Sequence, residues 1–179
     1  MKNIYCILGL SGCGKSTIAN ALAMEYGLKV LLSYTTRERR NVHDNDHIYI
    51  TDEEYVTIQD KVATRIRPDG KYCATSQQID ENDIYVIDFD GLDELTQKYQ
   101  GSKEIKTIYI EVSPETSVNR MQARGDAIEK IMFRIHDDNE TNTKENISKC
   151  DVVINGESVL AYKDVYKYIE SMESVESAM

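Results

Sequence analysis

Short apolar runs alternate with longer segments of helical patterning along most of this chain. Residues 4–8 (IYCIL) predict a buried strand, and residues 17–24 (TIANALAM) predict a helix soon after it. Further strand-like runs occupy residues 29–32, 84–88, 105–112 and 152–154. Strands and helices that alternate in this way are typical of a three-layer α/β domain with a mainly parallel central sheet.

The middle of the chain has a different pattern. Residues 62–67 and 71–74 predict a hairpin across Pro68-Asp69-Gly70, which is a strong turn signal. Residues 48–50 predict a short strand, and Thr51 precedes three acidic residues, a pattern that favours a helix start. Residues 33–46 are polar and predict a loop. The pattern therefore predicts a small β-rich insertion in the α/β core.

The last third is polar and helix-prone over residues 118–149, after a helix start at Ser113-Pro114-Glu115. A C-terminal helix is predicted from about Ser158. The 179 residues contain no internal repeat and suit one compact domain. We divide this domain into a core, an insertion and a polar helical segment. The core comprises residues 1–32, 84–118 and 150–172, the insertion residues 33–83, and the helical segment approximately 119–134.

Residues 9–16 (GLSGCGKS) match the phosphate-binding pattern G-x-x-x-x-G-K-[ST] at every fixed position, between a predicted strand and a predicted helix. The glycines let successive backbone N–H groups converge on one anion, and the helix N-terminus adds partial positive charge. Lys15 is expected to neutralise the β- and γ-phosphates, and the Ser16 hydroxyl to join the coordination of Mg²⁺. The predicted ATP-binding residues of this loop are Ser11, Gly12, Cys13, Gly14, Lys15, Ser16 and Thr17.

Residues 33–40 (SYTTRERR) contain three arginines within four residues, directly after a predicted strand. Guanidinium groups grip phosphate oxygens in a bidentate fork. Such a loop on its own is more often a solvated basic surface. Beside a P-loop it favours a second phosphate site, which we assign to Arg37 and Arg40.

Composition limits the partners. A formal net charge of -10 argues against a general nucleic-acid binder, which needs basic clusters. The four cysteines form neither a CxxC pair nor a metal-ligand spacing, which favours free thiols in a reducing compartment. No signal-peptide pattern is present, and no apolar run approaches the roughly 18–20 residues that span a bilayer. We expect a cytoplasmic monomer or homodimer that binds small-molecule nucleotides, with neither nucleic acid nor membrane as partner.

Taken together, the P-loop with Ser11 and the S-x-T-T-R-x-x-R pattern of residues 33–40 resemble the guanylate kinase family. The similarity continues through Asp46 and Tyr49 and through four later stretches, at residues 71–75, 87–91, 120–134 and 151–155. It covers nearly the whole chain. The resemblance implies a P-loop kinase fold in which the insertion binds the acceptor and residues 119–134 form a helical lid.

The resemblance also implies an activity, the ATP-dependent phosphorylation of a nucleoside monophosphate with Mg²⁺, with GMP or dGMP as the leading acceptor. The implied acceptor-binding residues are Ser33, Arg37, Arg40, Tyr49, Thr75 and Asp88. Arg120 and Asn155 are implied to bind ATP, and the implied catalytic residues are Lys15, Arg124 and Arg134. The two lid arginines would close over the triphosphate and stabilise the transferring phosphoryl group.

Alternatives stay open at this stage. The hydroxyls of Ser33 and Thr75 also suit strand-end capping, Asp88 suits a helix N-cap, and Asn155 belongs to an Asn-Gly turn. The lid arginines could equally be surface charges on a polar helix. The alternative functions are a related kinase acting on another nucleoside monophosphate or a ribose phosphate, and a guanylate-kinase-like binding module without catalysis.

Two departures from the family pattern concern the acceptor. Thr64 stands where the family has its guanine-reading glutamate, and Cys73 stands where a tyrosine holds the acceptor phosphate. A carboxylate that accepts from two guanine N–H groups discriminates better than a neutral hydroxyl. The sequence therefore predicts looser base selectivity than that of an ordinary guanylate kinase.

Overall fold

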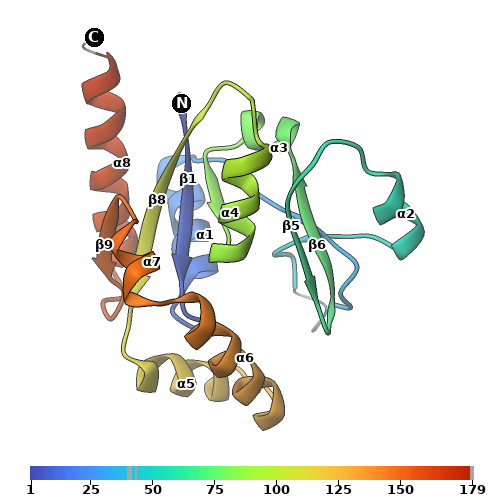
Figure 1. Cartoon of the computed structure of the whole chain (residues 1–179). Helices are drawn as coiled ribbons and strands as arrows, with labels where there is room; N and C mark the ends of the chain where they lie inside the picture. Colours follow the sequence, from blue (N-terminus) through green and yellow to red (C-terminus); the bar gives the residue numbers. More distant parts are fainter. Residues whose placement is uncertain (40–41, 43, 178–179) are drawn as a thin grey trace.

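The computed structural model describes residues 1–39, 42 and 44–177 of the chain. Its centre is a five-stranded sheet in the order β2-β7-β1-β8-β9, and all its neighbouring strands are parallel (Figure 1). The strands are β1 (Asn3–Gly9), β2 (Val30–Leu31), β7 (Ile84–Val86), β8 (Glu104–Glu111) and β9 (Val152–Asn155). The predicted parallel α/β core is confirmed.

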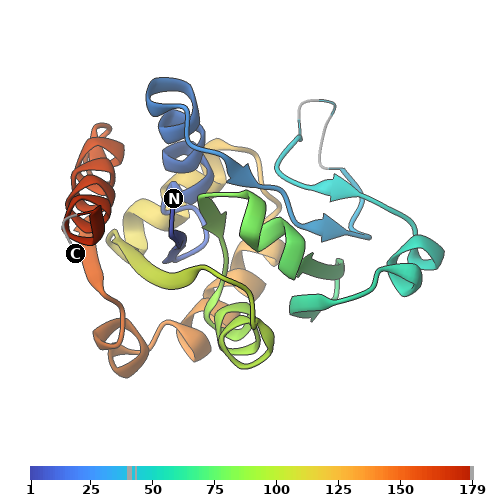
Figure 2. The same ribbon diagram turned by 90° about the horizontal axis from the view of Figure 1, so that it is seen from above.

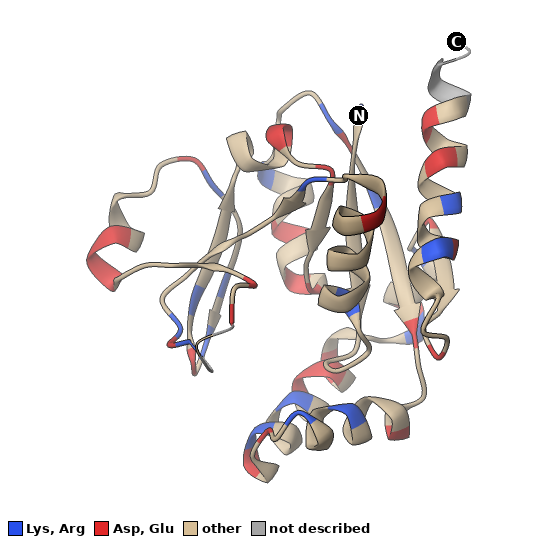
Figure 3. Ribbon diagram, turned by 180° about the vertical axis from the view of Figure 1, so that it is seen from behind, with Lys and Arg blue, Asp and Glu red and all other residues tan. Residues whose placement is uncertain are grey.

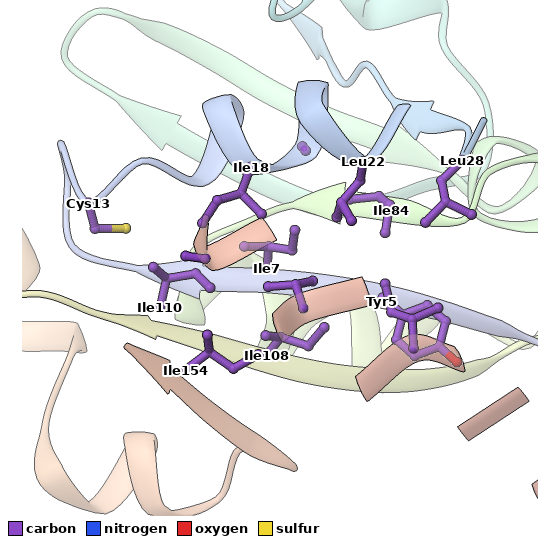
Figure 4. Close-up of a cluster of buried hydrophobic side chains, with 14 of the residues drawn as sticks. Tyr5, Ile7, Cys13, Ile18, Leu22, Leu28, Ile84, Ile108, Ile110 and Ile154 are labelled. Carbon is purple, nitrogen blue, oxygen red and sulfur yellow. The ribbon is translucent and has the colours of Figure 1, made fainter. Parts of the chain in front are cut away.

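Both faces of this sheet are covered by helices, because the strands are apolar on both sides. Tyr5 and Ile7 of β1 pack into a cluster with α1 (Lys15–Tyr26) and α8 (Ala161–Ser177), which Figure 4 shows in part. The alternate residues Ile4 and Leu8 belong to a second cluster with α4 (Phe89–Lys98). The period of two along β1 thus builds the three layers.

A second, four-stranded sheet lies beside the core in the order β4-β3-β6-β5 (Figure 2). Its strands are β3 (Tyr34–Thr35), β4 (Ile48–Tyr49), β5 (Lys61–Arg67) and β6 (Gly70–Thr75), and it is flanked by the short helices α2 (Asp52–Thr57) and α3 (Ser76–Glu81). The predicted hairpin is β5-β6, and Thr51 forms the expected cap of α2. We predicted a loop at residues 33–46, but β3 pairs with β4 on one side and β6 on the other. Pairing between distant segments makes this two-residue strand, which local pattern does not reveal.

Two helices lie beyond the carboxyl-terminal end of the central strands, α5 (Pro114–Ala123) and α6 (Ile128–Thr141). The short helix α7 (Lys144–Ser148) follows, and its Ile147 packs against the cluster that contains Ile4 and Leu8. Figure 1 shows α5 and α6 beyond the end of β1, on the side where the loop from β1 to α1 lies. We call α5 and α6 the lid helices. Among the described residues, no helix has the length and apolar character needed to cross a bilayer.

Candidate active site

A cleft of about 1500 Å³ runs from the P-loop, between β1 and α1, past the lid helices to the four-stranded sheet. It lies at the carboxyl ends of the parallel strands, where α/β proteins commonly bind ligands. The predicted site residues that line it are Ser11, Gly12, Cys13, Gly14, Lys15, Ser16, Thr17, Ser33, Asp88, Arg120, Arg124 and Arg134. Four predicted residues do not line it, namely Arg37, Tyr49, Thr75 and Asn155. Arg40 lies outside the described residues.

The P-loop backbone needs glycine for space as well as for conformation. Gly9, Gly12 and Gly14 all have positive φ angles, which residues with a Cβ rarely adopt. A Cβ at Gly9 would lie 2.6 Å from the carbonyl oxygen of Ile110, and one at Gly12 would lie 2.7 Å from that of Ser117. The loop is therefore packed tightly against β8 and α5, and its position is set by the core.

Lys15 is the first residue of α1 and its ammonium group lies over the loop. Its Nζ donates hydrogen bonds to the backbone oxygens of Gly9, at 2.6 Å, and Leu10, at 2.9 Å. Ser16 follows at the helix N-terminus and lines the same cleft. These groups form a cationic end of the cleft suited to polyphosphate.

Asp138 of α6 reaches the P-loop from the lid. The Ser11 N–H donates to its Oδ2 at 2.7 Å, and the Ser11 hydroxyl donates to its Oδ1 at 3.3 Å. Burial raises the pKa of the Asp138 carboxyl, although the Ser11 N–H and the Lys15 ammonium oppose the rise. Sequence reasoning missed this residue because nothing in the helical pattern marks it.

The lid arginines are held in two ways. Arg120 donates to the backbone oxygens of Cys13, at 2.8 Å, and Gly156, at 3.2 Å, so it ties the lid to the P-loop. Arg124 and Arg134 converge instead on one carboxylate, that of Asp126, at 2.5 and 3.4 Å. All three guanidinium groups line the cleft.

Arg37 is buried behind the cleft rather than in it. Its Nη1 lies 3.0 Å from Asp44 Oδ2 and its Nη2 lies 2.9 Å from the Tyr49 hydroxyl, whose pKa burial raises to about 12. The Arg39 guanidinium stacks on the Tyr49 ring at 4.2 Å from its centroid. In this arrangement Arg37 holds its own loop together, and its role in acceptor binding stays a prediction.

Three other predicted residues act as caps or turn residues. Thr75 accepts from the Gln78 N–H at the start of α3, and Asn155 accepts from the Glu157 N–H. Asp88 is the N-cap of α4, its Oδ2 lies 2.7 Å from Arg67 Nη2, and its role in acceptor binding stays a prediction. Its Oδ1 accepts from a backbone N–H as the N-cap of α4, while its Oδ2 faces the cleft.

Thr64, which the resemblance places at the base-reading position, does not line the cleft in this structure. The β5-β6 register shifts between Val62 and Arg65, and Ala63 has a φ of 53°. This bulge turns the Thr64 N–H toward the Glu94 carboxylate. The cleft is lined by Ala63 and Arg65 but not by Thr64.

In the neighbouring strand β6, too, the residue that lines the cleft is not the one that the resemblance indicated. Cys73 is fully buried, whereas Tyr72 lines the cleft, since adjacent strand residues point to opposite faces. His47 also lines the cleft, with its Nδ1 2.9 Å from the Ser33 hydroxyl and its ring 5.5 Å from that of Tyr72. We had assigned no role to His47 or to Tyr72.

Arg65 and Arg67 form the largest charged cluster that sequence reasoning missed. Arg65 Nη1 lies 2.5 Å from Asp90, and Arg67 Nη2 lies 2.7 Å from Asp88. Both also contact Asp137 of α6, at 3.1 and 3.0 Å. Figure 3 shows blue basic segments on the four-stranded sheet and on the lid helices. The R-x-R spacing in a predicted strand was the available signal, because residues two apart share a face.

Comparison with known proteins agrees with this architecture. The family model described as "AAA domain" matches residues 6–152. This chain belongs to that AAA domain family. Its fold is similar to that of guanylate kinase from Anaplasma phagocytophilum, with a TM-score of 0.56, 15% identity, and coverage of 97% of this chain and 85% of the other. No curated protein matches the chain in sequence. The AAA domain protein therefore has the predicted guanylate-kinase-like P-loop kinase fold.

Proposed function

We propose that this AAA domain protein transfers the γ-phosphoryl group of ATP to a nucleoside monophosphate, with GMP and dGMP as the first acceptors to test. One observation carries the proposal. A single cleft joins the complete P-loop to the four-stranded sheet, with three lid arginines lining the space between them. A donor and an acceptor can bind side by side in that cleft.

The expected chemistry is positioning and charge stabilisation. P-loop N–H groups and Lys15 would bind the triphosphate, while Arg124 and Arg134 would neutralise charge on the transferring group. Among the described residues, no cluster of three or more acidic, His or Cys side chains could hold a metal ion by itself. Mg²⁺ commonly takes one or two protein oxygens and completes its shell with phosphates and water, and Ser16 is suited to that role. Bound there, Mg²⁺ would neutralise phosphate charge.

A coupled assay of ADP release against a panel of ribo- and deoxynucleoside monophosphates, with ribose phosphate included, tests the proposal. We expect turnover with at least one nucleoside monophosphate and none for Lys15→Ala. ATP binding without turnover on any acceptor would overturn the proposal and favour the non-catalytic binding module. Turnover on ribose phosphate alone would favour the related-kinase alternative.

A further inference from the structure

Two consecutive residues of lid helix α6 occupy two different groups of anion-binding donors. The Asp138 carboxylate accepts from the Ser11 N–H of the P-loop at 2.7 Å. The Asp137 carboxylate lies between the two guanidinium groups of β5, with Oδ1 3.1 Å from Arg65 and Oδ2 3.0 Å from Arg67. Each carboxylate therefore stands where a phosphate oxygen would find hydrogen-bond donors and positive charge.

The Asp137 contact uses a geometry that arginines also offer to phosphate, with one oxygen on each of two guanidinium groups. Asp90 holds the Nη1 of Arg65, and Asp88 contacts the same Nη2 of Arg67 that Asp137 contacts, so both groups are fixed at the cleft. The buried Nε of Arg65 makes no hydrogen bond within the part of the chain that the structure describes, and it lies 3.7 Å from Asp88 Oδ2. The pair is therefore fixed by carboxylates at the start of α4, and withdrawal of Asp137 would leave the positions of its two oxygens open to phosphate oxygens.

The two anion sites lie around the same turn of α6, because consecutive residues of that helix reach them. Phosphoryl transfer requires the donor and acceptor phosphates to bind close together in one cleft, since reacting atoms must approach to roughly 3–3.5 Å. One of the two sites is the P-loop, which is the expected place of the donor phosphates. The acceptor phosphate must then lie beside it, where Asp137 contacts Arg65 and Arg67. Arg37, by contrast, forms a buried ion pair with Asp44.

We propose that Arg65 and Arg67 bind the phosphate of the acceptor, and that Asp137 and Asp138 stand at the acceptor- and donor-phosphate positions until nucleotides displace them. This inference rests on the proposed function, because it identifies the acceptor end of the same cleft. It assigns the phosphate to strand β5 rather than to the arginine-rich loop of residues 33–40.

Calorimetry with GMP and with guanosine tests the assignment, on protein saturated with Mg²⁺ and the non-hydrolysable donor analogue AMPPNP. Arg65→Ala and Arg67→Ala should each weaken GMP binding at least tenfold and leave guanosine and AMPPNP binding within twofold of the wild type. Lys71→Ala is the matched control, because Lys71 lies in the same sheet but pairs with Asp52 outside the cleft. Equal losses for GMP and guanosine, or no loss for GMP, would overturn the proposal.

A second probe separates this proposal from the choice of acceptor base. If the wild type binds no GMP, the guanine assignment fails, and inorganic phosphate is titrated into the same AMPPNP-saturated protein. Phosphate binding by the wild type that is lost in the Arg65→Ala/Arg67→Ala double variant supports the β5 site. Absence of phosphate binding by the wild type overturns it.

Displacement of the Asp137 and Asp138 carboxylates by nucleotides is tested separately. The substitutions used are conservative, so the test does not depend on alanine variants that fold poorly. Asp137→Asn keeps the shape and removes the charge, so GMP should bind severalfold more tightly. Asp138→Asn should do the same for AMPPNP. Arg67→Lys, which keeps the charge but loses the fork, should fall between wild type and Arg67→Ala for GMP. Weaker binding in both asparagine variants would show that the carboxylates only support the structure and would overturn the displacement model.

Discussion

Two groups of arginines in this AAA domain protein invite comparison, the loop at residues 33–40 and strand β5. The loop has the denser cluster in the sequence, yet Arg37, one of its two described arginines, is buried against Asp44. Arg65 and Arg67 are separated by one residue and both line the cleft. The density of basic residues in a sequence therefore says less about a phosphate site than the face on which a strand presents them.

The two groups of arginines also differ in which element supplies their acidic partners. Among the described residues, the Arg37 guanidinium takes its hydrogen-bond and ion-pair partners from its own segment, although its buried Nε makes no hydrogen bond with any of them. Releasing it would remove the Arg37 contact of the buried Asp44 carboxylate. Arg65 and Arg67 share Asp137, which belongs to the lid helix rather than to their sheet. A lid that moves can withdraw Asp137 without uncovering a buried charge. Availability for a ligand thus depends on which element supplies the counter-charge.

The largest expected effect is the loss of kcat when Lys15 of the P-loop is replaced, and the effects of the arginine variants are compared with it. Lys15→Ala should abolish transfer, with kcat reduced by about 10²–10³-fold or more, because the ammonium neutralises charge that spreads in the transition state. Steady-state kinetics and a thermal melt of the variant check this together. A folded variant with near-normal kcat would rule out this loop as the donor site.

Arg37→Ala should lower the free energy of unfolding, which would distinguish the loop arginine from the β5 arginines. Removing one partner of a buried ion pair typically costs about 3–5 kcal/mol, because the remaining charge stays buried and loses that partner. Urea unfolding of Arg37→Ala and of the Arg37→Ala/Asp44→Ala double variant measures this, and the double variant should be the more stable of the two. If Arg37→Ala instead folds normally and raises the acceptor KM much more than the ATP KM, the original assignment of Arg37 to acceptor phosphate is correct.

The contact between Asp138 of α6 and the P-loop should affect how the free energy of unfolding depends on pH. Burial raises the pKa of Asp138 in the folded protein, so the folded state binds more protons than the unfolded state above the ordinary carboxyl pKa. The contribution of this group to stability therefore falls as pH rises through that window. Lys15, Arg67 and Ser11 face the carboxylate and limit the shift. Melting temperatures between pH 4 and 7 should show a component of this sign that Asp138→Asn lacks, and identical pH profiles would contradict it.

The smallest effect concerns base selectivity. Thr64→Glu should leave the ratio of kcat/KM values among nucleoside monophosphates within about twofold of wild type, because the bulge turns position 64 away from the cleft. We still expect measurable activity on at least one monophosphate besides GMP and dGMP. A preference for guanine above about 10⁴-fold would contradict that expectation. A stronger preference for guanine in Thr64→Glu would instead indicate that residue 64 contacts the acceptor base.

The sequence by itself determined the parts of this protein whose signals are local. The strand before the P-loop, the glycines, Lys15 and the hairpin turn depend on residues a few positions apart, and period and spacing express them directly. The predicted parallel core follows from the order of such segments. The kinase fold was expected from the resemblance of the P-loop and of residues 33–40 to the guanylate kinase family.

Only the tertiary structure decided which side chains meet. Strand β3 exists because it pairs on both sides with distant segments. The bulge at Ala63 changes which β5 residues face the cleft, and packing of α6 brings Asp137 to the β5 arginines and Asp138 to the P-loop. Contacts of this kind depend on how whole elements pack, and a pattern within one segment carries no record of the element that will lie opposite it.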